Sequence, residues 1–295
     1  MEKIIALARL ARPHQYLKNG FLWLPLFFGN KLLDVQALAM TLWGFLAFCA
    51  AASSIYVIND LRDVEEDRRH PLKKFRPIAS FAVKRFEAVG FFFLLLLLTG
   101  IISLVCLPRE FFWVTGGYVL LNLGYSAGLK HLAIIDIICI AIGFVLRILA
   151  GGFASGVRIS PWIIMMTFLL ALFLALAKRR DDLLLEMAGN NTRKSLDGYN
   201  LEFVSLSMGV MASVIIVAYL LYTVSPEIIA KHGTSHMYLT AFWVIFGLLR
   251  YLQITFVEQR SGSPTLILLR DFVLQAVIIC WLVNVYILLY RFKHP

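Results

Sequence analysis

Charged residues are scarce in this chain: Asp, Glu, Lys and Arg make up 16% of its 295 residues, whereas 60% are hydrophobic. A soluble domain of this size carries more charge and does not hold long charge-free runs, so the composition excludes that class. Six charge-free runs are long enough to cross a bilayer as helices: 35–59, 88–108, 111–129, 159–177, 203–226 and 272–290. Three further apolar segments are interrupted by charges: 19–33, 132–157 and 232–257.

These segments predict an all-α, polytopic membrane protein with about nine transmembrane helices. The segment 19–33 is short and is broken by Lys31, so a half-helix or an interfacial segment is the alternative there. The chain also lacks low-complexity segments, long linkers and a clear internal repeat, which predicts one membrane domain over 1–295. The four cysteines stand singly in apolar runs without metal-ligand spacing, so we expect them to be packing residues.

The segment 1–15, MEKIIALARLARPHQ, lacks the uninterrupted apolar region and the small-residue cleavage site of a signal peptide. It predicts instead a short basic amphipathic helix at the membrane surface.

Lysine and arginine are distributed unevenly between the predicted loops. With the N-terminus inside, 20 basic residues fall on the cytoplasmic side and six outside. We therefore expect a multi-pass protein of the cell membrane whose cytoplasmic cap loops are 59–85, 126–132 and 178–200. This topology also accounts for most of the net charge of +10, so no nucleic-acid partner is expected.

An acidic stretch, NDLRDVEEDRRHPLKKFRP (59–77), follows the charge-free run 35–59. Asp60, Asp63 and Asp67 are spaced i, i+3 and i+7, so they share one face if the helix continues past the membrane surface. Like charges in one stripe repel each other unless a cation lies between them. The spacing alone leaves two alternatives open: one or two Mg²⁺ ions, or neutralisation by Arg62, Arg68 and Arg69.

Basic residues at the other cytoplasmic helix ends favour the first alternative. They are Arg12, Lys18, Lys73, Lys74, Arg76, Lys130, Lys178, Arg179 and Arg180. Carboxylates for a metal beside lysine and arginine donors form the set needed to bind a diphosphate leaving group. The sequence therefore predicts a metal-diphosphate site on the cytoplasmic side.

Two charges lie within one predicted transmembrane helix. Asp136 and Arg147 share a face, roughly 16 Å apart, which is too far for them to pair directly. Buried ionisable groups in a membrane usually face a cavity or a polar partner. We expect Asp136 to orient Lys130 or a bound sugar. Arg147 either meets an anionic head group or holds helices together, and Arg250 has the same two alternatives.

The NDxxDxxxD pattern of Asn59, Asp60, Asp63 and Asp67 resembles the motif at the end of the second helix in the UbiA superfamily of intramembrane prenyltransferases. Typical aromatic prenyltransferases of that superfamily carry a second, spaced aspartate motif after helix 6. Here 178–195, KRRDDLLLEMAGNNTRKS, has Asp181 and Asp182 side by side instead, which argues against an ordinary prenyl-diphosphate donor site.

The chain is most similar to one branch of the superfamily, the decaprenyl-phosphate phosphoribosyltransferases. The similar segments are RPHQYLKN (12–19), YVINDLRDVEEDRRHPLKKFRPIAS (56–80), YSAGLKHLAIIDIICIAIGFVLRILAG (125–151), KRRDDL (178–183) and GSPTLILLRD (262–271). Phe81 departs from the pattern because a glycine usually follows RPIAS, and we expect this to alter only a turn.

The resemblance implies nine transmembrane helices around a central cavity, Mg²⁺ as cofactor, and transfer of 5-phosphoribose from phosphoribosyl diphosphate (PRPP) to a polyprenyl (decaprenyl) phosphate. Asn59, Asp60, Asp63 and Asp67 would hold the metal, with the three aspartates as catalytic residues. The implied substrate-binding residues are Lys18, Asn59, Lys73, Arg76, Tyr125, Lys130, Asp136, Arg147, Lys178 and Arg179. Tyr125 is equally typical of an interfacial anchor. For His70 we favour a solvated loop histidine over a phosphate contact.

Two other functions compete with this one. An aromatic prenyltransferase would use a prenyl diphosphate donor, and a transporter or flippase would move a polyprenyl-linked anion. The sequence argues against the transporter because the unusual polar residues gather at one face and no repeat suggests alternating access. Association into a homo-oligomer stays open.

Overall fold

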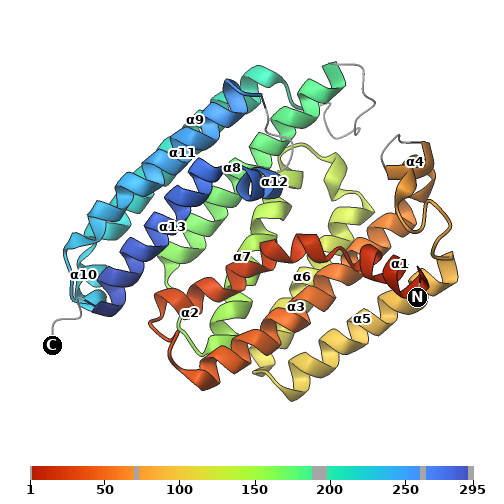
Figure 1. Cartoon of the computed structure of the whole chain (residues 1–295), viewed down its shortest axis with the longest axis horizontal. Helices are drawn as coiled ribbons and strands as arrows, with labels where there is room; N and C mark the ends of the chain where they lie inside the picture. Colours follow the sequence, from red (N-terminus) through yellow and green to blue (C-terminus); the bar gives the residue numbers. More distant parts are fainter. Residues whose placement is uncertain (1, 70–72, 188–197, 260–263, 292–295) are drawn as a thin grey trace. The chain divides into compact units, whose positions relative to one another are not determined.

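The computed structural model describes residues 2–69, 73–187, 198–259 and 264–291, and it contains only helices and connecting turns over those ranges (Figure 1). The chain divides into two compact units. The first comprises Met1–Ala127 and Leu146–Ile159, and the second comprises Gly128–Val145 and Ser160–Pro295. The predicted single domain and its central cavity stay predictions.

Seven helical segments in the described part of the chain are long and apolar enough to cross a membrane. Five are single helices: α3 (Val35–Arg62), α5 (Arg85–Val105), α7 (Ile135–Ser155), α8 (Pro161–Met187) and α9 (Leu201–Val224). The sixth is η5 (His236–Thr240) continued by α11 (Ala241–Phe256), and the seventh is α13 (Phe272–Tyr286) continued by η6 (Ile287–Arg291) as far as Tyr290. The all-α, membrane-spanning class is confirmed, but the number of nine is not. The predicted span 111–129 forms helix α6 (Arg109–Ala127), whose hydroxyl, amide and glycine residues make it less apolar than the seven.

The segment 19–33 does not form one continuous membrane helix, which leaves the alternative of a half-helix or an interfacial segment. This region holds the end of a 3₁₀ segment, η1 (Pro13–Trp23), and a five-residue helix, α2 (Leu24–Phe28). Pro25 stands in the first turn of α2, and Gly29 caps its end. Since proline cannot donate a backbone hydrogen bond inside a helix, a continuous span through this segment is disfavoured.

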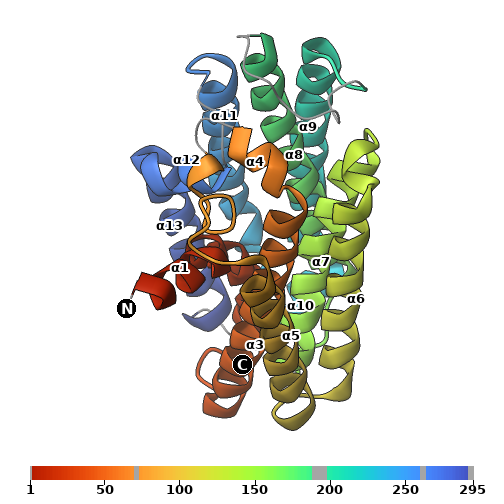
Figure 2. The same ribbon diagram turned by 90° about the vertical axis from the view of Figure 1, so that its right-hand side faces the viewer.

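In the first unit, helix α3 packs against α5, α6, η1 and the N-terminal helix α1 (Glu2–Ala11). Figures 1 and 2 both show α5 running alongside α3. Small residues of α3, among them Ala47, Ala51 and Ala52, are fully buried and permit this close packing. A Cβ atom at Gly151 of α7 would lie 2.1 Å from the Leu22 carbonyl oxygen, so only glycine lets η1 approach so closely.

In the second unit, α8 packs against α9, and α11 packs against α9 and α13. Phe173, Leu176, Val204 and Met208 lie at the centre of this core. Three short helices, α10 (Pro226–His232), α12 (Pro264–Arg270) and η3 (Leu129–His131), complete the unit.

Candidate active site

The acidic stretch lies where α3 ends and the short helix α4 (Val64–Arg69) begins. Asn59 and Asp60 occupy the last turn of α3, whereas Asp63 stands between the two helices as the C-cap of α3. The Asp63 amide donates to the Asn59 carbonyl at 2.9 Å, and the Asp67 amide donates to the Asp63 carbonyl at 2.8 Å. The expected unbroken helix is therefore interrupted at Asp63, although the turn spacing is kept.

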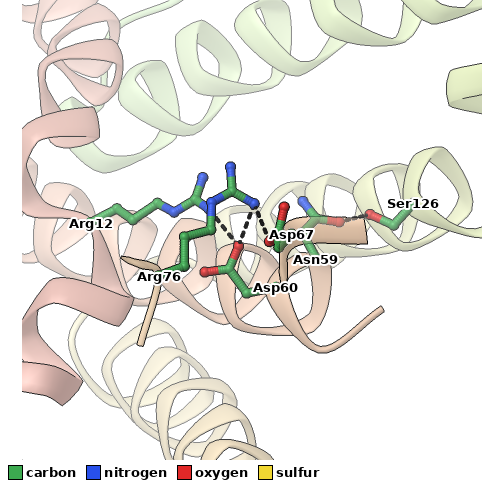
Figure 3. A network of polar contacts seen from close by, with 6 residues as sticks. All are labelled: Arg12, Asn59, Asp60, Asp67, Arg76 and Ser126. Carbon is green, nitrogen blue, oxygen red and sulfur yellow. Dashed lines mark hydrogen bonds and ion pairs between the residues drawn. The ribbon is translucent and has the colours of Figure 1, made fainter. Parts of the chain in front are cut away.

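Asp60 and Asp67 converge on one guanidinium (Figure 3). Arg76 Nη1 donates to Asp60 Oδ1 at 3.1 Å and to Asp67 Oδ2 at 2.6 Å. Arg12 Nη2 also donates to Asp60 Oδ1, at 2.5 Å. The two carboxylate side chains are only 2% and 3% exposed, so both charges need a close cation.

Sequence reasoning did not find this pairing. It named Arg62, Arg68 and Arg69 as the alternative counter-ions and assigned Arg76 to a phosphate. Arg68 instead pairs with Glu65 at 3.0 Å. Arg12 is 48 residues from Asp60 in the sequence, so no helical spacing could have indicated the contact.

The Arg12 side chain reaches Asp60 through an unusual backbone conformation. Arg12 has φ 55° and ψ 59°, in the left-handed region that non-glycine residues seldom adopt. Two hydrogen bonds to α3 hold this turn: Ser53 Oγ donates to the Ala11 carbonyl at 2.9 Å and lies 2.8 Å from the Tyr16 hydroxyl. The strained turn thus aims Arg12 at the acidic site.

His14 lies beside this turn. Burial, with Arg12 and Lys18 nearby, lowers the pKa of the His14 imidazole. His14 is therefore neutral near pH 7 and adds no charge to the site.

Ser126 and three of the predicted site residues also belong to the first unit. Ser126 of α6 donates a hydrogen bond to the Asn59 side-chain oxygen, which fixes the carboxamide (Figure 3). Tyr125 precedes Ser126 and is half-buried. Lys18 in η1 and Lys73 in η2 (Lys73–Phe75) are also half-buried. His70 lies outside the described residues.

Arg147 lies in a buried polar network with Asn19 and Tyr118. Its Nε donates to Asn19 Oδ1 and its Nη2 to the Tyr118 hydroxyl, both at 2.9 Å. Asn19 in turn donates to Cys49 Sγ at 3.2 Å. These contacts join α7, η1, α6 and α3, and they favour the helix-holding role over the head-group contact.

In the second unit, Asp136 pairs with Arg179, a partner that the sequence did not indicate. Arg179 Nε lies 2.9 Å from Asp136 Oδ2, and its Nη1 donates to Asp182 at 2.6 Å. The Tyr199 hydroxyl donates to Asp136 Oδ1 at 2.6 Å. Burial and this bond raise the pKa of Tyr199, so the phenol stays a donor. Sequence reasoning missed Tyr199 because nothing in its spacing relates it to Asp136.

Lys130 in η3 and Lys178 in α8 belong to the second unit and are half-buried. The cap loop predicted over 178–200 is described only at its two ends, because 188–197 lie outside the described residues. Arg250, the other intramembrane arginine, pairs with Asp271 at 2.6 Å and with Glu258 at 2.7 Å, so its contacts also favour a structural role.

The buried carboxylates of Asp60 and Asp67 suit a hard divalent cation, because their oxygens face one position that a cation occupies. That position holds the Arg76 guanidinium. Within the described ranges, no group of three or more His, Cys, Asp or Glu side chains is arranged to hold a metal ion. The residues therefore fit Mg²⁺ chemically, but as placed they are paired with arginines.

The apolar helices long enough to cross a membrane define a multi-pass membrane protein, and one of them ends in paired acidic and basic side chains. The UbiA prenyltransferase family model matches residues 22–265. This chain belongs to the UbiA prenyltransferase family.

Several relatives are named decaprenyl-phosphate phosphoribosyltransferase. The protein from Corynebacterium glutamicum is 33% identical over 92% of this chain and 82% of its own length. The protein from Mycolicibacterium smegmatis is 32% identical over 95% of this chain and 91% of its own. These relatives confirm the family resemblance, and their names agree with the predicted transferase activity.

The fold also matches a solved structure, a UbiA homolog from Archaeoglobus fulgidus bound to DMAPP and Mg²⁺. The TM-score is 0.71 at 21% identity, over 95% of this chain and 98% of that protein. The match confirms the UbiA-like fold.

Proposed function

We propose that this enzyme transfers 5-phosphoribose from PRPP to a polyprenyl phosphate, with decaprenyl phosphate as the acceptor, and releases diphosphate. The observation that carries the proposal is the pair of buried carboxylates, Asp60 and Asp67, held against arginines at the end of α3. The relatives named decaprenyl-phosphate phosphoribosyltransferase support the same substrates.

The reaction is a displacement at ribose C1. The bond from C1 to the diphosphate oxygen breaks, and the diphosphate leaves with the electron pair. An oxygen of the lipid phosphate forms the new bond to C1 from the opposite face, so the configuration inverts. A phosphate monoester is already anionic at neutral pH, so no strong general base is needed, and none is evident among the proposed site residues.

The proposed cofactor is Mg²⁺, held by Asp60, Asp63 and Asp67 with Asn59. When bound, the metal neutralises charge on the leaving diphosphate. Ser126 orients the Asn59 carboxamide toward that role. Asp60 and Asp67 are buried, so their charges act at low dielectric, where electrostatic stabilisation is strongest.

The cationic side chains bind the two anionic substrates and offset their repulsion. Lys18, Lys73 and Arg76 are the proposed contacts for the PRPP phosphates. Lys130, Lys178 and Arg179 are the proposed contacts for the lipid phosphate or the 5-phosphate. The Arg179 guanidinium also pairs with Asp136 and Asp182. Tyr125 is proposed to position a phosphate or a ribose hydroxyl. Asp136 and Arg147 are proposed to hold neighbouring side chains in place rather than to contact the substrate.

We place the reaction on the cytoplasmic side of the cell membrane, because the basic residues concentrate there. The lipid-linked phosphoribose would then serve as a precursor of arabinose donors for cell-envelope glycans.

A donor comparison on purified protein in detergent tests the proposal. One reaction contains labelled PRPP, decaprenyl phosphate and Mg²⁺, and the other contains a prenyl diphosphate and an aromatic acid. The proposal requires label in the lipid fraction of the first reaction and its loss with EDTA. A prenylated ring in the second reaction, with PRPP unused, would assign the chain to the aromatic prenyltransferases.

A further inference from the structure

Arg76 is the one side chain shown to bridge Asp60 and Asp67 among the described residues. Of these two aspartates, Arg12 is shown to pair with Asp60. The carboxylates are buried on α3 and α4, whereas the Arg76 side chain is 27% exposed. The bridge thus joins two fixed, desolvated anions to a cation that still faces solvent.

Burial favours a cation between these two carboxylates as long as both are charged. Two close anions removed from water are strongly destabilised unless they are paired or protonated. Either a guanidinium or a metal ion satisfies that requirement, and both cannot occupy the same position.

The turn that carries Arg76 is held by backbone hydrogen bonds, so the guanidinium can move away from the aspartates while the turn stays folded. The Arg76 amide donates to the Lys73 carbonyl, and the Arg76 carbonyl accepts from the Ser80 amide, both at 2.9 Å. These backbone bonds fix the turn independently of the guanidinium. The long side chain can therefore change rotamer while the turn stays in place.

We propose that Arg76 is an exchangeable counter-ion: it holds Asp60 and Asp67 together without metal, and it releases them when a divalent cation binds. The released guanidinium is then free to bind the substrate's diphosphate. This inference rests on the metal site of the proposed function. It implies positive coupling, since metal binding frees Arg76 for diphosphate and diphosphate binding draws Arg76 away from the aspartates.

The test measures Mn²⁺ binding by electron paramagnetic resonance on the full chain in detergent, without substrate. Removing the competing guanidinium in Arg76→Gln should tighten Mn²⁺ binding by about tenfold, a typical size for coupling between two ligands. Arg68→Gln is the matched control, because Arg68 lies on α4 but pairs with Glu65. Its affinity should equal that of the wild type. Equal or weaker Mn²⁺ binding by Arg76→Gln would overturn the proposal.

A stability measurement covers the case in which Arg76→Gln folds poorly. The variant is purified with Mg²⁺ and then treated with EDTA while its thermal unfolding is followed. The proposal requires that Mg²⁺ raises the Tm of Arg76→Gln more than that of the wild type, because only the variant lacks the guanidinium that bridges Asp60 and Asp67. A purely structural bridge would instead give a loss of Tm that Mg²⁺ does not restore.

The two hypotheses fail in different ways. If neither wild type nor variant binds Mn²⁺ while label still passes from PRPP to the lipid, the exchange is overturned and the transfer reaction stands. If Mn²⁺ binds as described but no label passes, the exchange is supported and the proposed substrates are wrong.

Discussion

Arg12 and Asp60 are 48 residues apart in the sequence, yet their side chains meet at 2.5 Å at the end of α3. The contact joins the start of η1 to the acidic motif. It makes the N-terminal turn part of the candidate site, although this turn lies outside the residues matched by the family model.

Asp60→Asn should abolish most of the transfer activity while the protein still inserts into membranes. The amide cannot supply the anionic charge that the proposed metal needs, and we expect kcat to fall by about 10²–10³-fold. Glu65→Gln is the control, because Glu65 is exposed and pairs only with Arg68 and Arg85 in the described contacts. Near-normal rates of Asp60→Asn at limiting Mg²⁺ would refute the assignment of this residue.

Ser53→Ala should weaken PRPP binding because it removes the hydrogen bonds that hold the Arg12 turn. One such bond contributes about 1 kcal/mol, so kcat/KM should fall about fivefold, mostly through KM. Ser54→Ala is a close control, since Ser54 is buried on the same helix but donates only to the Ala51 carbonyl of that helix. A loss of Tm without any change in KM would mean that Ser53 has only a structural role.

Arg147→Met should destabilise the protein, because it leaves Asn19 and Tyr118 without their shared buried donor. Losing two hydrogen bonds from a charged group costs about 3 kcal/mol, and Tm in detergent should drop by about 5 °C or more. Arg147→Lys should restore little, since lysine cannot reproduce the two fixed donors. An unchanged Tm with a raised KM for the lipid would instead assign Arg147 to the head group.

Asp271 should make the stability of the second unit depend on pH. Its hydrogen bonds with Arg250 are the main cause that lowers the pKa of the Asp271 carboxyl, and it also caps α13 through the Leu274 amide. Because the folded pKa lies below the unfolded one, the charged form stabilises the fold at neutral pH. That contribution is lost as the pH falls below about 4.

Asp271→Asn tests this link. Its Tm at pH 7 should be lower than that of the wild type, and the difference should shrink as the pH falls toward 3. Asp34→Asn is the control, since Asp34 caps α3 through the Ala37 amide and has no arginine among its described contacts. A Tm difference for Asp271→Asn that stays constant with pH would contradict the prediction.

Much of the fold could be predicted because long apolar runs in a membrane protein have few alternatives to a helix. The segments 35–59 and 203–226, for example, became α3 and α9 with shifts of a few residues. The exception is 19–33, where one proline, Pro25, and two glycines, Gly20 and Gly29, disfavour a continuous helix despite the hydrophobic residues. A hydropathy average does not include the backbone effects of proline and glycine, so it does not detect such a break.

The ion pairs of the candidate site could not be predicted, although its aspartates and arginines were identified. Local spacing predicts which residues share a helix face, but partners such as Arg76 come from a turn whose path depends on tertiary packing. Phe81 illustrates the same limit. It has φ 64°, which explains why a glycine is usual there, and its ring lies 4.2 Å from the Arg68 guanidinium.

The most direct test of the account is the fate of label from PRPP. Purified protein with decaprenyl phosphate and Mg²⁺ should move labelled phosphoribose into the lipid fraction, and EDTA should stop the transfer. Label that stays in the aqueous phase, while a prenyl diphosphate and an aromatic acid yield a prenylated ring, would contradict the proposed function.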